Sequence, residues 1–136
     1  MAKQSGLAWT TLSVDDSGGT ARDIRNDITN FEFATPRAVQ ETTGIDKSAM
    51  ERLLLLADFS ITLNGVANFS ATTTAHAVLR TVSSTSVLRT ISITIGGASL
   101  ANECVITDYQ LTRANSGELT WQAPCVLADG TVPTWT

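Results

Sequence analysis

The sequence is poor in the residues that build catalytic and nucleic-acid-binding sites. Of its 136 residues one is a histidine, His76, and only two are lysines, Lys3 and Lys47. The formal net charge is −4 at pH 7. A surface that grips nucleic acid needs clustered Lys and Arg, so this composition argues against that function. The arginines are scattered, and we interpret three of them as salt-bridge or interface partners: Arg80, Arg89 and Arg113.

The common catalytic and cofactor motifs are also missing. No partners at metal-ligand spacing accompany His76, and no Gly-x-Ser-x-Gly element is present. Gly18-Gly19 and Gly96-Gly97 are turn pairs and not phosphate-binding loops. We therefore predict no catalytic, cofactor or metal residues and no enzymatic activity. A hydrolase with a pocket around His76 stays open, because Ser-His-Asp groups meet only in space.

Cysteine is scarce, and long apolar runs are absent. The start of the chain, Met-Ala-Lys-Gln-Ser-Gly, has no apolar segment and predicts no secretory signal. A membrane-spanning helix needs a run of about 18 apolar residues, and the sequence contains no such run. In a chain made and kept in a reducing cytoplasm, Cys104 and Cys125 are expected to be buried thiols and not a disulfide.

What the chain does have is Ser, Thr, Val and Ile, a composition that favours strands. Its length fits one domain, residues 1–136, with a core that needs no disulfide or metal. The clearest strand is 119–127, in which Leu119, Trp121, Ala123, Cys125 and Leu127 alternate with polar neighbours. The turn Ala114-Asn-Ser-Gly117 joins it to a strand predicted over 104–112.

Five further strands are predicted from alternation and turn residues: 6–14, 27–33, 58–63, 75–82 and 87–95. Turns are expected at Asp15-Asp-Ser-Gly-Gly19, Asn64-Gly65 and Gly96-Gly97. Residues 36–46 are expected to form a longer connection.

One helix is predicted over 47–56. Asp46 is a suitable N-cap. Ala49, Leu53 and Leu56, with Met50 and Leu54 alongside, form an apolar stripe at helical spacing that we interpret as core packing. The expected fold is therefore mainly β: an antiparallel β-sandwich or curved sheet of about seven strands with one flanking α-helix.

Several segments resemble a known family in their order along the chain. They are VITDYQLTR at 105–113, SGELTWQAP at 116–124, ADGTVPTW at 128–135, GLAWTTLSVDDSGGTARDIRNDITNFEF at 6–33, TTGIDKSAMERLLLLADFSITLNG at 42–65 and AHAVLRT at 75–81. Together they resemble the tail tube (major tail) proteins of long-tailed, non-contractile bacteriophages. The loop at 65–74 looks shorter or altered relative to that family, and its role stays open.

The resemblance implies a structural virion protein of the phage tail, assembled in the bacterial host cytoplasm. It implies hexameric rings that stack into a tube, with phage DNA passing through the lumen without specific binding. The implied partners are other copies of the chain and the tape-measure, tail-terminator and distal tail proteins, with no membrane. No catalytic role comes with the resemblance.

Two hypotheses follow about particular segments. Carboxylates in the lumen would repel DNA phosphates at short range, within a Debye length of about 8 Å, and Glu103 and Asp108 are the candidate lumen-facing acidic residues. The alternative is that both face solvent or pair with Arg89 or Arg113. Residues 1–6, 34–45 and 130–136 are least able to form core and are the expected assembly contacts.

Other functions remain possible on the sequence alone. A capsid decoration protein or a tail-terminator-like protein would share the fold class. A carbohydrate-binding module would need exposed aromatic platforms. Trp9 and Trp121 lie on strand faces that look buried, which leaves Trp135 available.

Overall fold

The computed structural model describes residues 3–7, 9–70 and 74–136. The strands are β1 (Thr11–Asp15), β2 (Ala21–Asp23), β3 (Ile28–Ala34), β4 (Arg37–Glu41), β5 (Arg52–Ala57), β6 (Ser60–Val66), β7 (Arg89–Ile95), β8 (Ala98–Ile106), β9 (Gln110–Arg113) and β10 (Leu119–Leu127). A 3₁₀ turn, η1 (Arg25–Asp27), precedes β3, and one short helix, α1 (Ala75–Leu79), precedes β7. The expectation of a mainly β, antiparallel fold is confirmed.

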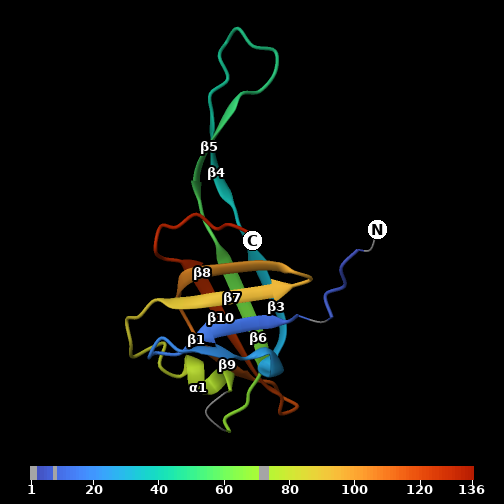
Figure 1. The fold of residues 1–136 in the computed structure, drawn as a ribbon, viewed down its shortest axis with the longest axis vertical. Coiled ribbons are helices and arrows are strands. Elements are labelled where there is room, and N and C mark those ends of the chain that lie inside the picture. The colour runs from blue at the N-terminus through green and yellow to red at the C-terminus, as the bar shows by residue number, and fades with distance from the viewer. Residues whose placement is uncertain (1–2, 8, 71–73) are drawn as a thin grey trace.

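Eight strands form one curled sheet, and the other two form a separate ribbon. The order in the sheet is β2-β1-β7-β8-β10-β6-β3, with β9 paired to the end of β10. Every pairing is antiparallel. The sheet folds over on itself, so that β1 and β7 lie across the core from β6 and β10 (Figure 1). The ribbon, β4–β5, projects away from this body.

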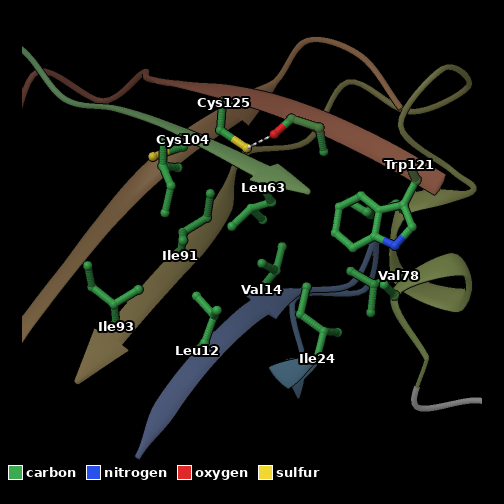
Figure 2. Close-up of a cluster of buried hydrophobic side chains, with 14 of the residues drawn as sticks. Leu12, Val14, Ile24, Leu63, Val78, Ile91, Ile93, Cys104, Trp121 and Cys125 are labelled. Carbon is green, nitrogen blue, oxygen red and sulfur yellow. Dashed lines mark hydrogen bonds between the residues drawn. The ribbon is translucent and has the colours of Figure 1, made fainter. Parts of the chain in front are cut away.

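The core lies inside the curl and comes from alternate residues of the strands. Leu12 and Val14 of β1, Ile91 and Ile93 of β7, and Leu63 of β6 converge there (Figure 2). Strand periodicity sends the intervening residues to the outer face. The predicted apolar face of 119–127 is correct, since Trp121, Ala123 and Cys125 are buried while Leu119 and Leu127 are half-buried.

The hairpin predicted around 114–117 is present, but its first strand is divided. β9 pairs with β10 directly across the turn, and β8 pairs with the later part of β10. The break falls after Ile106, where the Thr107 amide still donates to the Pro124 carbonyl at 3.0 Å. Cys104 lies opposite Leu127, and Cys125 lies opposite Ile106. Both thiols are free and buried, as expected.

The helix predicted over 47–56 is wrong. Residues 52–57 form β5, and residues 36–46, expected to be a connection, contain β4. Four successive leucines, Leu53–Leu56, fit a helical stripe and a strand equally well. Residues 52–57 form a strand because they pair with β4, and this tertiary context overrides the modest helix preference of leucine. The structure therefore has ten strands among the described residues, where about seven were expected.

The strand predicted over 75–82 is also wrong, because α1 occupies its first part. The Thr74 hydroxyl accepts from the Ala77 amide at 3.3 Å, and the Asp27 carboxylate accepts from the Ala75 amide at 2.8 Å. These bonds satisfy amides that a helix start leaves unpaired. Val78 and Leu79 are buried in the core. A helix of this length has too few residues to show a period in the sequence.

Other boundaries differ less. The first strand begins at Thr11 and not at residue 6, and β2 and the start of β8 were not predicted. Asn64-Gly65 lies inside β6 and is not a turn. The turns at Asp15–Gly19 and Gly96-Gly97 are present, with Gly19, Gly96 and Gly97 at positive φ. Of the loop at 65–74, residues 71–73 lie outside the described residues.

Candidate assembly surfaces

The most unusual surface is the two-stranded ribbon, which stands clear of the core. β4 and β5 pair with each other in their own two-stranded sheet and with no strand of the main sheet. Figure 1 shows the ribbon and its tip, residues 42–51, extending well beyond the body. An isolated hairpin is marginally stable in water. This one is held by ladder bonds, by the Glu51 amide donating to Thr43 Oγ1 at 2.8 Å, and by Arg37 Nε donating to the Leu55 carbonyl at 2.9 Å.

Both faces of the ribbon carry exposed leucine side chains. Val39 lies opposite Leu54, and Gln40 lies opposite Leu53, so alternation places Leu54 and Leu56 on one face and Leu53 and Leu55 on the other. Their side chains are from 42% to 85% exposed. A soluble monomer rarely exposes so continuous an apolar patch unless another surface covers it.

A second candidate surface is a groove beside the edge strand β3, here named the aromatic groove. Its volume is about 630 Å³, and it is lined by Gly6, Leu7, Trp9, Leu12, Arg25 and residues 28–33. Trp9 meets Phe31 edge to face, with ring centroids 4.9 Å apart. Arg25 Nη1 donates to the carbonyls of Trp9 and Thr10 at 2.8 and 2.9 Å, which fixes the wall opposite β3.

The C-terminal segment is tied to the body. The backbones of Thr136 and Ser99 exchange hydrogen bonds of 2.9 and 3.0 Å. Trp135 lies against Phe33, with ring centroids 5.9 Å apart, and stays 46% exposed. The segment therefore links the beginning of β8 with β3, while Val132 remains exposed.

A third candidate surface is the outer face of β3, β6, β7, β8 and β10. Register places Thr90 opposite Glu103, Pro124 opposite Thr62, and Glu32 opposite Thr62. The face is made of hydroxyl, amide and small apolar side chains, and its charged residues among those described are Glu32 and Glu103. Arg89 is the one Lys or Arg in these five strands, and its side chain points into the core.

Of the two candidate lumen residues, Glu103 lies on this face. It accepts a hydrogen bond from Thr90 Oγ1. Partial burial, with the carboxylates of Asp15 and Asp129 nearby, raises the pKa of Glu103. Asp108 does not join it: this residue is exposed in the loop between β8 and β9.

The suggested partnership of Glu103 with Arg89 is wrong, because Arg89 points to the opposite face. Its side chain is 2% exposed and donates to the Val78 carbonyl at 2.7 Å, the Asp15 carbonyl at 3.2 Å and Thr81 Oγ1 at 2.9 Å. Burial lowers the pKa of this guanidinium. Arg89 thus fastens the segment after α1 to the ends of β1 and β7. Its place in an alternating strand gave no signal of this role.

His76 belongs to an aromatic cluster. Its Nδ1 lies 3.1 Å from the Tyr109 hydroxyl, and its ring meets Phe69 edge to face at 4.6 Å. Within the described residues, no group of three or more His, Cys, Asp or Glu side chains is arranged to hold a metal. In the same part of the chain, no helix has the length and apolar character to cross a membrane.

Comparison with known proteins identifies the fold. The sequence matches no protein-family model and no curated protein. Among solved structures, a chain of the virion of a native gene transfer agent (GTA) particle superposes with a TM-score of 0.74 at 15% identity, covering 98% of this chain and 99% of that chain. A chain of the tail of an empty GTA particle, with C6 symmetry, gives a TM-score of 0.72 at 18% identity and the same coverage.

These matches extend over 98% of the chain. The expected likeness to tail proteins is therefore confirmed at the level of the fold. The protein shares its fold, from one end of the domain to the other, with chains of GTA virion and tail structures.

Proposed function

We propose that this protein is a structural subunit of a phage-type tail tube, forming hexameric rings that stack around a DNA-conducting lumen. The observation that carries the proposal is the match over 98% of the chain to a chain of a tail with C6 symmetry. Tape-measure, tail-terminator and distal tail proteins are the further partners that such a role requires. The protein acts by assembly, and we assign it no catalytic step.

The exposed surfaces support self-assembly. A ribbon with exposed leucines and a groove with an aromatic wall lie on different parts of the same chain. Contact between two different patches of identical subunits is head-to-tail, which yields a ring where the rotation closes and a filament where it does not. Residues 34–45 contain β4 and the first part of the ribbon tip, so this segment is the strongest of the three proposed contact segments.

We assign the outer face of β7 and β8, which carries Glu103, to the lumen. A conduit for DNA must not retain it, and Lys or Arg on the wall would bind phosphates. This face carries the Glu103 carboxylate and, among the described residues, no cation, because Arg89 of β7 points into the core. Glu103 is on it. Asp108, beyond the end of β8, would lie near one rim.

The test of the lumen assignment is charge reversal. Glu103→Lys with Asp108→Lys should leave tubes assembled but slow DNA release, with a larger defect at low salt, because phosphate contacts strengthen as salt falls. Lysines at the exposed turn residues Ser116 and Asn115 serve as the matched control. Unchanged DNA delivery by assembled Glu103→Lys/Asp108→Lys tubes would contradict the assignment.

A further inference from the structure

Resting on the proposed assembly, we propose that the ribbon of one copy docks in the aromatic groove of a second copy and adds a strand to the free edge of β3. The occupant is another copy of this chain. The proposal identifies the two surfaces that form a head-to-tail contact.

The ribbon needs cover on both faces. Leu54 and Leu56 point to one side, and Leu53 and Leu55 point to the other. Lying flat on a neighbour would cover only one pair. Insertion into a groove, with one strand edge paired, covers both pairs at once. The ribbon also offers outer strand edges, because β4 and β5 pair only with each other among the described strands.

The groove presents the complementary features. β3 pairs with β6 on one side and with no other described strand on its opposite side. Every residue from Ile28 to Phe33 lines the groove. If one face of β3 lined the groove, only alternate residues would do so, and the unbroken run therefore shows that the edge of the strand faces the groove. Such an edge is a template for strand addition.

The side chains around the groove suit leucine. Leu7 on its rim is 93% exposed, and Trp9 and Phe31 form its apolar wall. Glu32 also lines the groove, and Arg52 begins β5 on the ribbon. The Glu32 carboxylate of the groove and the Arg52 guanidinium of the ribbon are therefore complementary in charge.

A chain cannot make this contact with itself. β3 runs into β4 through residues 35–36, so the ribbon continues beyond the end of β3 (Figure 1). The groove lies beside residues 28–33, on the other side of that junction. The two surfaces therefore meet only between copies. Each copy then contributes its ribbon to one neighbour and its groove to another, and such head-to-tail contacts close a ring or extend a filament.

Disulfide trapping tests the pairing. Full-length Leu55→Cys (ribbon) and Leu7→Cys (groove) are purified separately, mixed and oxidised; the native thiols are buried. The mixture should form a cross-linked heterodimer, and neither variant alone should form one efficiently. The matched control replaces Leu7→Cys with Ser116→Cys, an exposed cysteine in the β9–β10 turn. Cross-linking of the control as fast as of the ribbon–groove mixture would overturn the proposal.

A second assay does not depend on cysteine geometry. Leu54→Asp/Leu56→Asp disables the ribbon but retains the groove, and Leu7→Asp disables the groove but retains the ribbon. All three positions are exposed, so the monomers should stay folded. Each variant alone should associate about 30-fold more weakly than the natural sequence, as loss of an interface anchor commonly does. Mixed, they should form dimers and stop, because one competent ribbon meets one competent groove.

The outcomes separate this contact from the assembly itself. If the natural sequence forms rings or tubes while the two variants assemble as well as it does, the ribbon–groove contact is wrong and the proposed function stands. If the natural sequence stays monomeric at every concentration, both are wrong. Dimers from the mixture, with monomers from each variant alone, establish the contact.

Discussion

Gly65 shows how one residue fixes the packing at the end of the core. A Cβ at this position would lie 1.9 Å from the Asp27 carbonyl oxygen and 2.7 Å from Trp121 Nε1. No real side chain tolerates such distances, so η1, β6 and the Trp121 ring can approach only around glycine. The same ring donates from Nε1 to the Val66 carbonyl at 3.2 Å.

Gly65→Ala should therefore be strongly destabilising. The added methyl group must displace backbone and an indole ring, and overpacking of this kind costs about 3 kcal/mol or more in free energy of unfolding. Chemical denaturation of the monomer measures it. Gly6→Ala is the control, because no atom lies within 4 Å of its Cβ position. Equal stabilities for the two variants would contradict this account of the packing.

The two thiols offer a test of core integrity. Burial raises the pKa of both Cys104 and Cys125 to about 12. Because the thiolate is the reactive form, neither should react with a thiol reagent at pH 8 until the protein unfolds. Labelling with and without denaturant, followed by mass spectrometry, checks this. Rapid labelling of the native protein would show that the β8–β10 pairing opens.

The same pKa shift predicts an alkaline loss of stability. Above the ordinary thiol pKa the unfolded state releases protons that the folded state retains. The free energy of unfolding therefore falls as pH rises from about 9 toward 12, by at most about 1.4 kcal/mol per pH unit for each thiol. Cys104→Ala, compared with the natural sequence across this range, should flatten the decline.

At the scale of elements, the ribbon shows what local sequence does not determine. Residues 52–57 carry helix-forming leucines, yet they form β5 because β4 provides a ladder of backbone hydrogen bonds. The leucine stripe was interpreted as core, and this is also wrong: these side chains are exposed in the monomer. An apolar segment in a sequence indicates that its side chains are buried somewhere. The sequence pattern does not distinguish burial in a subunit interface from burial in the core of the monomer.

The C-terminal segment is more firmly attached than its composition indicated. Deleting 131–136 removes the Trp135–Phe33 contact and the two Thr136–Ser99 hydrogen bonds, with a loss of about 2–3 kcal/mol. The monomer should remain folded, because β7 and β10 still hold β8. Tube formation should fall.

Circular dichroism and sedimentation separate these two effects. Trp135→Ala is the matched variant: it removes the aromatic contact but keeps the backbone pairing, and it should lose about half as much stability. If the deletion variant fails to fold, the segment belongs to the core and not to the assembly surface.

At the scale of the molecule, the features that could be predicted from the sequence are those that depend on the alternation of apolar and polar side chains along a strand and on glycine at turns. The faces of residues 89–95 and 119–127, the buried thiols and the turns at glycine pairs follow from a period of two and from φ requirements. The curl of the sheet, the order of its strands and the split between β8 and β9 depend on long-range pairing. No local pattern contains that information.

The assembly surfaces were predictable only in part. Residues 34–45 were singled out because they cannot form core, and most of them lie in the ribbon. Glu103 lies on the polar outer face, but Asp108 does not join it. The aromatic groove was not predicted, since it joins the N-terminal segment, η1 and an edge strand. Phe31 and Phe33, which alternate along the predicted strand 27–33 and both line the groove, gave the one signal.

The central claim is that this chain assembles into a tube, and electron microscopy of the purified full-length protein tests it most directly. Negative-stain images over a range of concentrations, with particle masses from the same samples, should show six-subunit rings or stacked rings. Their central channel should be wide enough for duplex DNA. The ribbon variant Leu54→Asp/Leu56→Asp should show folded monomers under the same conditions. A protein of the natural sequence that stays monomeric up to its solubility limit would contradict the claim.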